Sequence, residues 1–202
     1  RAGDPGARET AVVRLQGAID RAIHLVGQLL LLARQESGEA SSAMPRGPVA
    51  LHDVVSQCVS AALPQAQVRG VDLGVVQADA VSTQGDAVAL RTLLGNLVDN
   101  AVKYAPQGGQ VDVTLLSNDG APLLVVEDNG PGIPEAERER AFDRFYRLAD
   151  GNSSAEGSGL GLAIVRAVAG QHGAQVELGQ SERLGGLRVT VRFAHSSGAA
   201  SS

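Results

Sequence analysis

The segment 90–104 constrains the fold more than any other part of the sequence, because it combines an apolar stripe with a polar side at helical spacing. The apolar positions recur every three or four residues, as on one side of an α-helix: Leu90, Leu93, Leu94, Leu97, Val98 and Ala101. Asn96, Asn100 and Lys103 follow at steps of four and three, so they share a second side. Such a helix must pack its apolar stripe against another layer of the protein.

The polar side of this segment carries groups that suit a nucleotide. Amide oxygens, as on Asn96 and Asn100, fit a hard cation such as Mg²⁺. Lys103 offers a point charge for phosphate, and the ring of Tyr104 can stack on a base. Taken alone, the segment is equally compatible with a core helix that exposes one solvated side.

Two glycine-containing segments follow. Residues 125–134 predict a strand that runs into a glycine turn, and residues 157–165 predict a glycine loop that opens an apolar helix. A helix start that follows flexible glycines offers free backbone N–H groups to a phosphate. Either loop alone is weak evidence for a nucleotide site.

Taken in order, residues 93–104, 125–134 and 157–165 resemble the N, G1 and G2 boxes of the sensor histidine kinases. Residues 142–147, Phe-Asp-Arg-Phe-Tyr-Arg, resemble the F box of that family. Four boxes in the correct order make a specific match, which weaker motifs extend over nearly the whole chain. The resemblance implies a GHKL (Bergerat) ATP-binding fold, shared with gyrase, the chaperone Hsp90 and the mismatch-repair protein MutL, with ATP and Mg²⁺ as cofactors.

The order of elements, with hairpins and no repeated βαβ unit, predicts an α+β fold in which helices cover one face of a mixed sheet. A long bundle helix precedes this two-layer sandwich. The expected elements are a strand near Val49, a helix from about Leu51 to Leu63, a strand at 71–76, the helix of 90–104 capped by Asp86, a hairpin turning at Asp119-Gly120, a helical turn after Pro134, a helix at 161–171 and a hairpin over 176–193.

The resemblance divides the chain into four parts. Residues 1–37, whose apolar positions follow a heptad seam, correspond to the second helix of the dimerisation and phosphotransfer hairpin. The first helix, with the phospho-accepting histidine, is expected in a longer protein, since Arg1 is not an initiator methionine. Residues 38–48 read as a linker, 49–194 as the catalytic ATP-binding domain and 195–202 as a disordered tail.

The resemblance also assigns roles to individual residues. Asn100 is expected to hold Mg²⁺ against the triphosphate, and Asp128 to accept a hydrogen bond from the adenine amino group. Phe142 and Phe145 are expected to anchor a lid, although both could simply be core residues. The full set of expected nucleotide contacts is Asn96, Asn100, Lys103, Tyr104, Asp128, Gly130, Gly132, Ile133, Phe145, Arg147, Gly157, Gly159, Leu160, Gly161 and Leu162.

The segment 149–158 is polar and shows no hydrophobic period, so we expect a mobile lid that nucleotide orders. His172, which precedes Gly173, is expected to end a helix as a C-terminal cation. No side chain is identified as a nucleophile. His24 falls opposite the heptad seam and is expected to be a surface residue rather than a phosphate acceptor.

Composition excludes several classes of protein. The formal charge of −5 and the lack of an aromatic-rich basic patch argue against nucleic-acid binding. A single cysteine, Cys58, excludes an internal disulfide framework and a cysteine zinc site. The longest apolar run, 29–33, is far shorter than the roughly 20 residues that span a bilayer. We therefore expect a cytoplasmic portion without membrane contact, from a protein that the resemblance places in the bacterial inner membrane.

The favoured function is transfer of the ATP γ-phosphoryl group to a histidine on the missing helix, and onward to an aspartate of a response-regulator receiver domain. The second subunit of a homodimer is the other expected partner. Two alternatives stay open: a GHKL ATPase or serine kinase that acts on a partner protein, and a degenerate module that no longer binds nucleotide.

Overall fold

The structure is a computed structural model that describes residues 47–147 and 158–195. All of these residues fall within one compact unit, residues 42–202. The expected bundle helix at 1–37, linker residues 38–46, lid residues 149–157 and tail residues 196–202 lie outside the described residues. The fold described below is therefore that of the expected catalytic domain.

A five-stranded sheet forms one layer of the domain, with the strand order β2-β4-β5-β7-β6. Its strands are Asp72–Ala78 (β2), Gln110–Asn118 (β4), Ala121–Asp128 (β5), Gln175–Gln180 (β6) and Leu187–Arg192 (β7). Strand β2 runs parallel to β4, whereas the other neighbours are antiparallel. The prediction of a mixed sheet is therefore confirmed.

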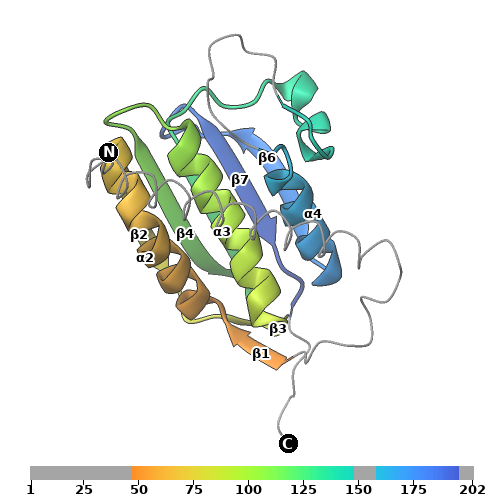
Figure 1. Ribbon diagram of the computed structural model, residues 1–202. Coiled ribbons are helices and arrows are strands. Elements are labelled where there is room, and N and C mark those ends of the chain that lie inside the picture. Colours follow the sequence, from red (N-terminus) through yellow and green to blue (C-terminus); the bar gives the residue numbers. More distant parts are fainter. Residues whose placement is uncertain (1–46, 148–157, 196–202) are drawn as a thin grey trace, which may run out of the picture. The chain divides into compact units, whose positions relative to one another are not determined.

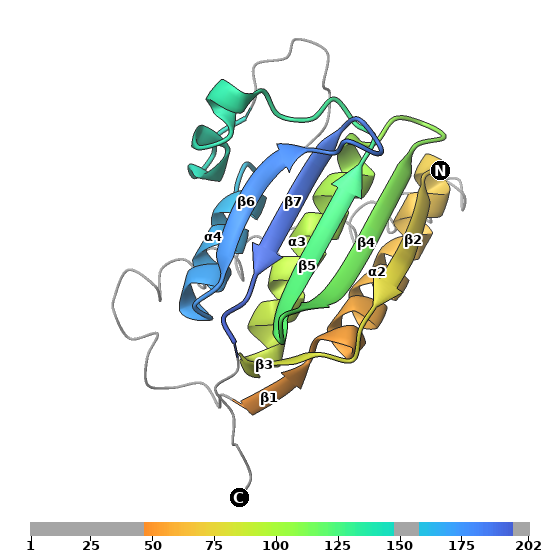
Figure 2. The ribbon, with the colours of Figure 1, turned by 180° about the vertical axis from the view of Figure 1, so that it is seen from behind.

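Three helices form the second layer and cover one face of this sheet (Figure 1). They are Leu51–Arg69 (α2), Ala87–Tyr104 (α3) and Gly161–Gln171 (α4). The opposite face carries none of these three helices (Figure 2). Between the layers lie fully buried side chains from both, including Leu93 and Val98 of α3, Val113 of β4, Val126 of β5 and Ile164 of α4. The predicted two-layer α+β sandwich is confirmed.

A small antiparallel sheet lies beside the start of α2. It pairs Gly47–Ala50 (β1) with Ser82–Gly85 (β3). Strand β1 was expected near Val49, but β3 was not predicted. The sequence of β3 is short and polar, so it has no apolar alternation that would reveal a strand.

Helix α2 is longer than the sequence predicts. The sequence predicts an end at about Leu63, yet the helix continues past Pro64 to Arg69, although proline disfavours a helical conformation at the residue before it. The last turn places Ala66 in the core with 1% of its surface exposed. Gly70, with a φ of 65°, then ends the helix, and its N–H caps the carbonyls of Ala66 and Gln67. Core packing and this cap outweigh the local cost of the proline.

The predicted turns are largely found. Asp119 and Gly120 have φ values of 50° and 85° and connect β4 to β5, as expected for a two-residue hairpin turn. The expected helical turn after Pro134 is a single 3₁₀ turn, Glu135–Glu137 (η2), and a second one follows at Arg140–Phe142 (η3).

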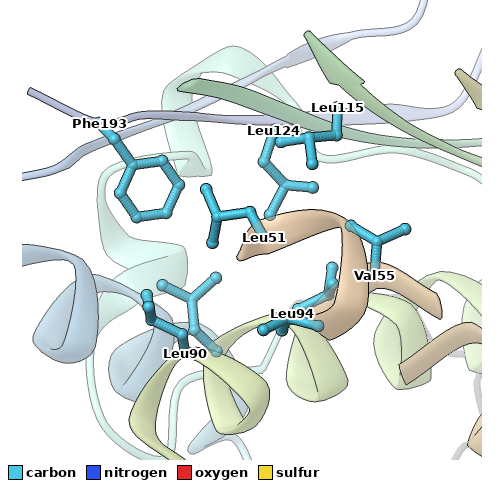
Figure 3. A pocket seen from close by; sticks show the side chains of 9 residues that line it. Leu51, Val55, Leu90, Leu94, Leu115, Leu124 and Phe193 are labelled. Atoms are coloured by element: carbon cyan, nitrogen blue, oxygen red, sulfur yellow. The ribbon is translucent and has the colours of Figure 1, made fainter. Parts of the chain in front are cut away.

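A small apolar cavity of about 10 Å³ lies between α2, α3 and the sheet (Figure 3). Figure 3 labels seven of the side chains that line it: Leu51, Val55, Leu90, Leu94, Leu115, Leu124 and Phe193. Its lining has no polar side chain that could hold a water molecule. None of the predicted nucleotide contacts lines it, so this cavity is a packing void of the core.

Candidate functional site

Helix α3 positions two amide side chains beside the start of α4. The Asp86 carboxylate begins α3 by accepting a hydrogen bond from the N–H of Val88 at 2.8 Å, so the predicted cap is confirmed. Asn96 is 6% exposed and Asn100 is half-buried. A Cβ atom on Gly161 would lie 3.0 Å from Asn100 Nδ2 and 3.3 Å from Asn96 Oδ1. The first turn of α4 is therefore a direct neighbour of both amides.

Asp128 lies at the end of β5 and is only 4% exposed. Its Oδ1 accepts hydrogen bonds from the N–H groups of Gly130 at 2.8 Å and Leu187 at 3.2 Å. Burial raises the pKa of the Asp128 carboxyl above its usual value, and the two N–H groups oppose this rise. Among the described residues, no hydrogen bond is found to Oδ2. The backbone thus holds the carboxylate through one of its two oxygens.

Two glycines allow the backbone to close around Asp128. A Cβ atom on Gly130 would lie 2.7 Å from the carbonyl oxygen of Tyr104, at the end of α3. A Cβ atom on Gly186 would lie 2.5 Å from the carbonyl oxygen and from Oδ1 of Asp128. Neither position has room for a larger residue. These contacts bring the end of α3, the end of β5 and the start of β7 together.

The other predicted residues of the G1 segment lie just beyond. Gly132 has a φ of 71°, and a Cβ atom there would contact Gly186 at 3.5 Å. The half-buried Ile133 provides a carbonyl that accepts a hydrogen bond from Arg138 Nε at 3.2 Å. Both residues follow Asp128 along the edge of the candidate site.

Lys103 and Tyr104 interact with each other in the last turn of α3. The ammonium group of Lys103 lies 3.3 Å from the Tyr104 hydroxyl oxygen and 4.7 Å from the centroid of its ring. Tyr104 is 41% exposed. The backbone carbonyl of Tyr104, at the end of this turn, is the group that lies next to Gly130.

The segment that resembles the F box contacts the start of α4. Phe145 donates its N–H to the carbonyl of Gly159 at 3.0 Å, and it has a φ of 62°, which is unusual for a residue other than glycine. Phe145 is 66% exposed, so the core alternative is wrong for this residue. The Phe142 ring instead lies 5.0 Å from the guanidinium of Arg166 in α4. Arg147 is exposed.

Residues 158–162 prepare the first turn of α4. The Ser158 hydroxyl accepts a hydrogen bond from the N–H of Leu160 at 3.3 Å, and Leu160 is 1% exposed. Gly159 has a φ of 68°, where glycine is favoured. Leu162 is half-buried. Gly157 lies outside the described residues.

His172 has a role that sequence reasoning missed. Its Nε2 accepts a hydrogen bond from the N–H of Asp86 at 3.0 Å, while its Nδ1 lies 2.8 Å from the carbonyl oxygen of Val168 and carries the proton. The ring therefore links the end of α4 to the start of α3, and the predicted helix end is confirmed because α4 ends before His172 and Gly173 has a φ of 63°. The partners are 86 residues apart, and no local pattern reveals them.

Leu187 was also missed as a site residue, because its contribution is a backbone N–H that any residue other than proline supplies. The signal that could have found it is the pair Gly185-Gly186, directly before the last strand. Paired glycines at such a position indicate a close approach of backbone to backbone.

A family model described as "Histidine kinase-, DNA gyrase B-, and HSP90-like ATPase" matches residues 85–197, which is more than half of the chain. The chain belongs to this family. The matched range includes every residue that the sequence assigns to nucleotide binding. The prediction of a GHKL-type ATP-binding domain is confirmed.

Curated relatives place this ATPase-family chain among sensor proteins. It is 39% identical over 191 residues to the sensor protein QseC of Escherichia coli (strain K12), covering 94% of this chain and 40% of QseC. It is 36% identical over 191 residues to the sensor protein kinase PmrB of Pseudomonas aeruginosa, covering 95% of this chain and 39% of PmrB. The chain thus spans about 40% of the length of these relatives.

Solved structures of histidine kinases share the fold of this family member. The cytoplasmic segment of histidine kinase QseC matches with 30% identity and a TM-score of 0.61, covering 88% of this chain and 95% of that one. Full-length ShkA in complex with AMPPNP matches with 27% identity and a TM-score of 0.75, covering 95% and 40%. The resemblance to sensor histidine kinases, drawn from four sequence boxes, is confirmed.

Two features of the described residues bear on the site and its setting. No described helix has both the length and the hydrophobicity needed to cross a membrane. His, Cys, Asp and Glu side chains of the described part form no group of three that could hold a metal ion. The oxygen donors beside the start of α4 are the amides of Asn96 and Asn100, a kind of donor that suits a hard cation such as Mg²⁺.

Proposed function

We propose that this domain binds ATP with Mg²⁺ and transfers the γ-phosphoryl group to a histidine on a dimerisation helix. From there the phosphoryl group passes to an aspartate of a response-regulator receiver domain. The observation that carries the proposal is that α3 contacts the start of α4 through the amides of Asn96 and Asn100, and contacts the turn after the buried Asp128 at its C-terminal end. The Asp128 carboxylate suits the base of a nucleotide, the amides suit its metal ion, and the start of α4 suits its phosphates.

Adenine recognition is proposed for Asp128. Its Oδ2 would accept a hydrogen bond from the exocyclic amino group of adenine, and the N–H groups of Gly130 and Leu187, which bond to Oδ1, support this assignment. Guanine has a carbonyl at the corresponding position, which cannot donate to a carboxylate. A buried acceptor left without its donor costs free energy, so the site should prefer ATP to GTP.

Phosphate binding is proposed for the first turn of α4. The N–H groups of a first helical turn and the positive end of the helix dipole suit an anion, and Gly161 lets this turn pack directly against the amides of Asn96 and Asn100. Asn100 would hold Mg²⁺, which neutralises charge on the phosphates when bound. Lys103 would add a cation in the last turn of α3, one turn beyond Asn100. The chain would act by positioning and electrostatics, as expected for a loose phosphoryl-transfer transition state.

The remaining assignments follow the same proposal. The acceptor histidine lies on the dimerisation hairpin of a homodimer rather than at His24. This portion works in the cytoplasm, as part of a protein anchored in the bacterial inner membrane. These assignments are supported by relatives that are sensor proteins of greater length.

Labelled ATP separates the candidate functions. The chain should be incubated with γ-labelled ATP and Mg²⁺, with and without a separately made hairpin that carries a phospho-acceptor histidine. Acid-labile label on the hairpin is the expected result. Phosphate release without the hairpin would support an ATPase, acid-stable label on serine would support a serine kinase, and failure to bind ATP would support a degenerate module. Stable label on His24 would contradict the proposal.

A further inference from the structure

We propose that Ser181 and Glu127 are positioning residues for adenine recognition. They hold the turn between β6 and β7, residues 181–186, which presents a backbone donor to Asp128. The inference rests on the proposed role of Asp128 in ATP binding and extends it to residues on the other side of the sheet.

The turn contacts Asp128 directly. Gly186 donates its N–H to the Asp128 carbonyl oxygen at 3.1 Å, and the next residue, Leu187, donates its N–H to Oδ1 at 3.2 Å. Because a Cβ atom on Gly186 would lie 2.5 Å from Oδ1, the turn backbone is packed tightly against the carboxylate. A shift of the turn would remove one of the two donors to Oδ1 and leave the carboxylate free to rotate.

Ser181 holds this turn together with both its backbone and its side chain. Its N–H donates to the carbonyl of Gly186, and its carbonyl accepts from the N–H of Gly185, each at 2.8 Å. Its hydroxyl accepts from the N–H of Leu184 at 3.0 Å and donates to Glu127 Oε1 at 2.8 Å. Ser181 is 1% exposed, so water cannot replace these bonds if the hydroxyl is removed.

Glu127 anchors Ser181 from the opposite face of β5. Adjacent strand residues point to opposite faces, so Glu127 points away from the side on which Asp128 meets the helices. Glu127 is 8% exposed, and its charge is compensated by Arg188 at 3.6 Å and by Arg183 of the turn at 3.7 Å. The Arg183 guanidinium also pairs with the buried Asp112. Two consecutive carboxylates therefore hold the same turn from the two faces of the sheet.

The Ser181→Ala variant tests this arrangement. It removes the donor to Glu127 and the acceptor for Leu184, so the turn loosens and Leu187 no longer fixes Asp128 Oδ1. We expect ATP affinity to fall about three- to tenfold, the effect of losing one or two hydrogen bonds. GTP does not use Asp128 as its acceptor, so its affinity should fall less and the preference for ATP should narrow.

The experiment measures affinities of the 202-residue chain for Mg²⁺-ATP and Mg²⁺-GTP by competition against one labelled ATP analogue. Urea unfolding of each variant is measured in parallel. Glu127→Gln keeps an acceptor for Ser181 and should retain most of the ATP preference, whereas Glu127→Leu should behave like Ser181→Ala. Thr190→Val is the matched control, because Thr190 is 7% exposed on the same face of the sheet but lies outside the turn.

The outcomes separate this inference from the proposed function. An unchanged ATP preference in Ser181→Ala, or a parallel loss of affinity for both nucleotides, would overturn the positioning role. If Ser181→Ala does not fold, the comparison of Glu127→Gln with Glu127→Leu decides instead, and equal ATP preference in these two variants would overturn it. Asp128→Asn is measured beside them. An unchanged preference there would reject the proposed adenine contact itself.

Discussion

Asp128 and Asn100 differ in how deeply their side chains are buried and in what they contact. The Asp128 carboxylate is buried and one of its oxygens is already held by two N–H groups. Asn100 is half-buried and faces the first turn of α4. Substitutions at these two residues should therefore affect separate parts of nucleotide binding, the base and the metal-bound phosphates.

Asp128→Asn should weaken ATP binding and reduce the ratio of the affinity for ATP to the affinity for GTP. The amide can still present an oxygen, but the charge-assisted hydrogen bond is lost, at a cost of about 1–3 kcal/mol. Competition binding of ATP against GTP checks this expectation. A variant that keeps the full preference for ATP would show that Asp128 does not read the base.

The pH dependence of stability should carry a signature of Asp128. Burial raises its pKa in the folded state, so ionisation of this carboxyl is harder in the folded chain than in the unfolded chain. The ionisation of Asp128 therefore lowers the free energy of unfolding as the pH rises from the pKa of the unfolded chain through the higher pKa of the folded chain. The stability of Asp128→Asn relative to the native chain should rise over that window, as measured by urea unfolding at several pH values. A constant difference would contradict the raised pKa.

Asn100→Ala should reduce the Mg²⁺-dependent part of ATP affinity while the fold stays intact. The side chain lies off the apolar stripe of α3, so its removal opens no cavity in the core. ATP titrations with Mg²⁺ and with a chelator measure the difference. If Mg²⁺ raises the ATP affinity of the native chain and of the variant by the same factor, Asn100 does not bind the metal ion.

At the scale of elements, the packing of α3 against α4 sets the position of the first turn of α4, where phosphate binding is proposed. One end of this pair is fixed where Gly161 meets the amides of α3, and the other where His172 bonds to the backbone of Asp86. Gly85 is required at the second contact, since a Cβ atom there would lie 2.3 Å from His172 Cδ2. The two helices are thus joined near both ends of α4.

Gly85→Ala should displace the His172 ring and loosen this pairing. We expect a loss of about 1–3 kcal/mol in the free energy of unfolding, in the range measured for overpacked sites. Gly74→Ala is the control, because a Cβ atom there would meet nothing within 4 Å. Chemical denaturation of both variants measures the effect. Equal stability of the two would mean that the ring moves aside without cost.

The elements that could be predicted from sequence are those whose signals are local. The period of α3 and the turn at Asp119-Gly120 are visible within a few residues, and the resemblance added the order of the site segments. The extension of α2 beyond Pro64 depends on the packing of Ala66 in the core. The local sequence does not reveal this packing, because a proline normally indicates the end of a helix. The hydrogen bonds from the Asp86 N–H to His172 Nε2 and from the Leu187 N–H to Asp128 Oδ1 join residues that are far apart in the sequence, and in each bond the donor is a backbone N–H that any residue other than proline supplies.

At the scale of the whole domain, the core and the candidate site use different sides of the same helix. Leu93, Leu94 and Leu97 of α3 face the sheet and α2, whereas Asn100 faces α4. The apolar cavity between the layers lies on the core side (Figure 3). Stability and nucleotide affinity should therefore respond separately to mutation.

Leu94→Ala should enlarge this cavity and lower the free energy of unfolding by about 2–5 kcal/mol. Because Leu94 is 1% exposed and lines the void, little of the loss can be recovered by solvent. Nucleotide affinity of the folded fraction should remain close to that of the native chain. Thermal unfolding and ATP titration below the transition measure the two effects, and a matching loss of affinity would show that core and site are coupled.

The hydrogen bond between the Phe145 N–H and the Gly159 carbonyl has a consequence for how the chain can change in length. It joins two backbone positions that are 14 residues apart in the sequence. The entropic cost of closing a flexible loop grows slowly, by about 0.6 kcal/mol for each doubling of its length. A change in the number of residues between Phe145 and Gly159 should therefore cost less stability than a change of the same size among the residues that contact Asp128.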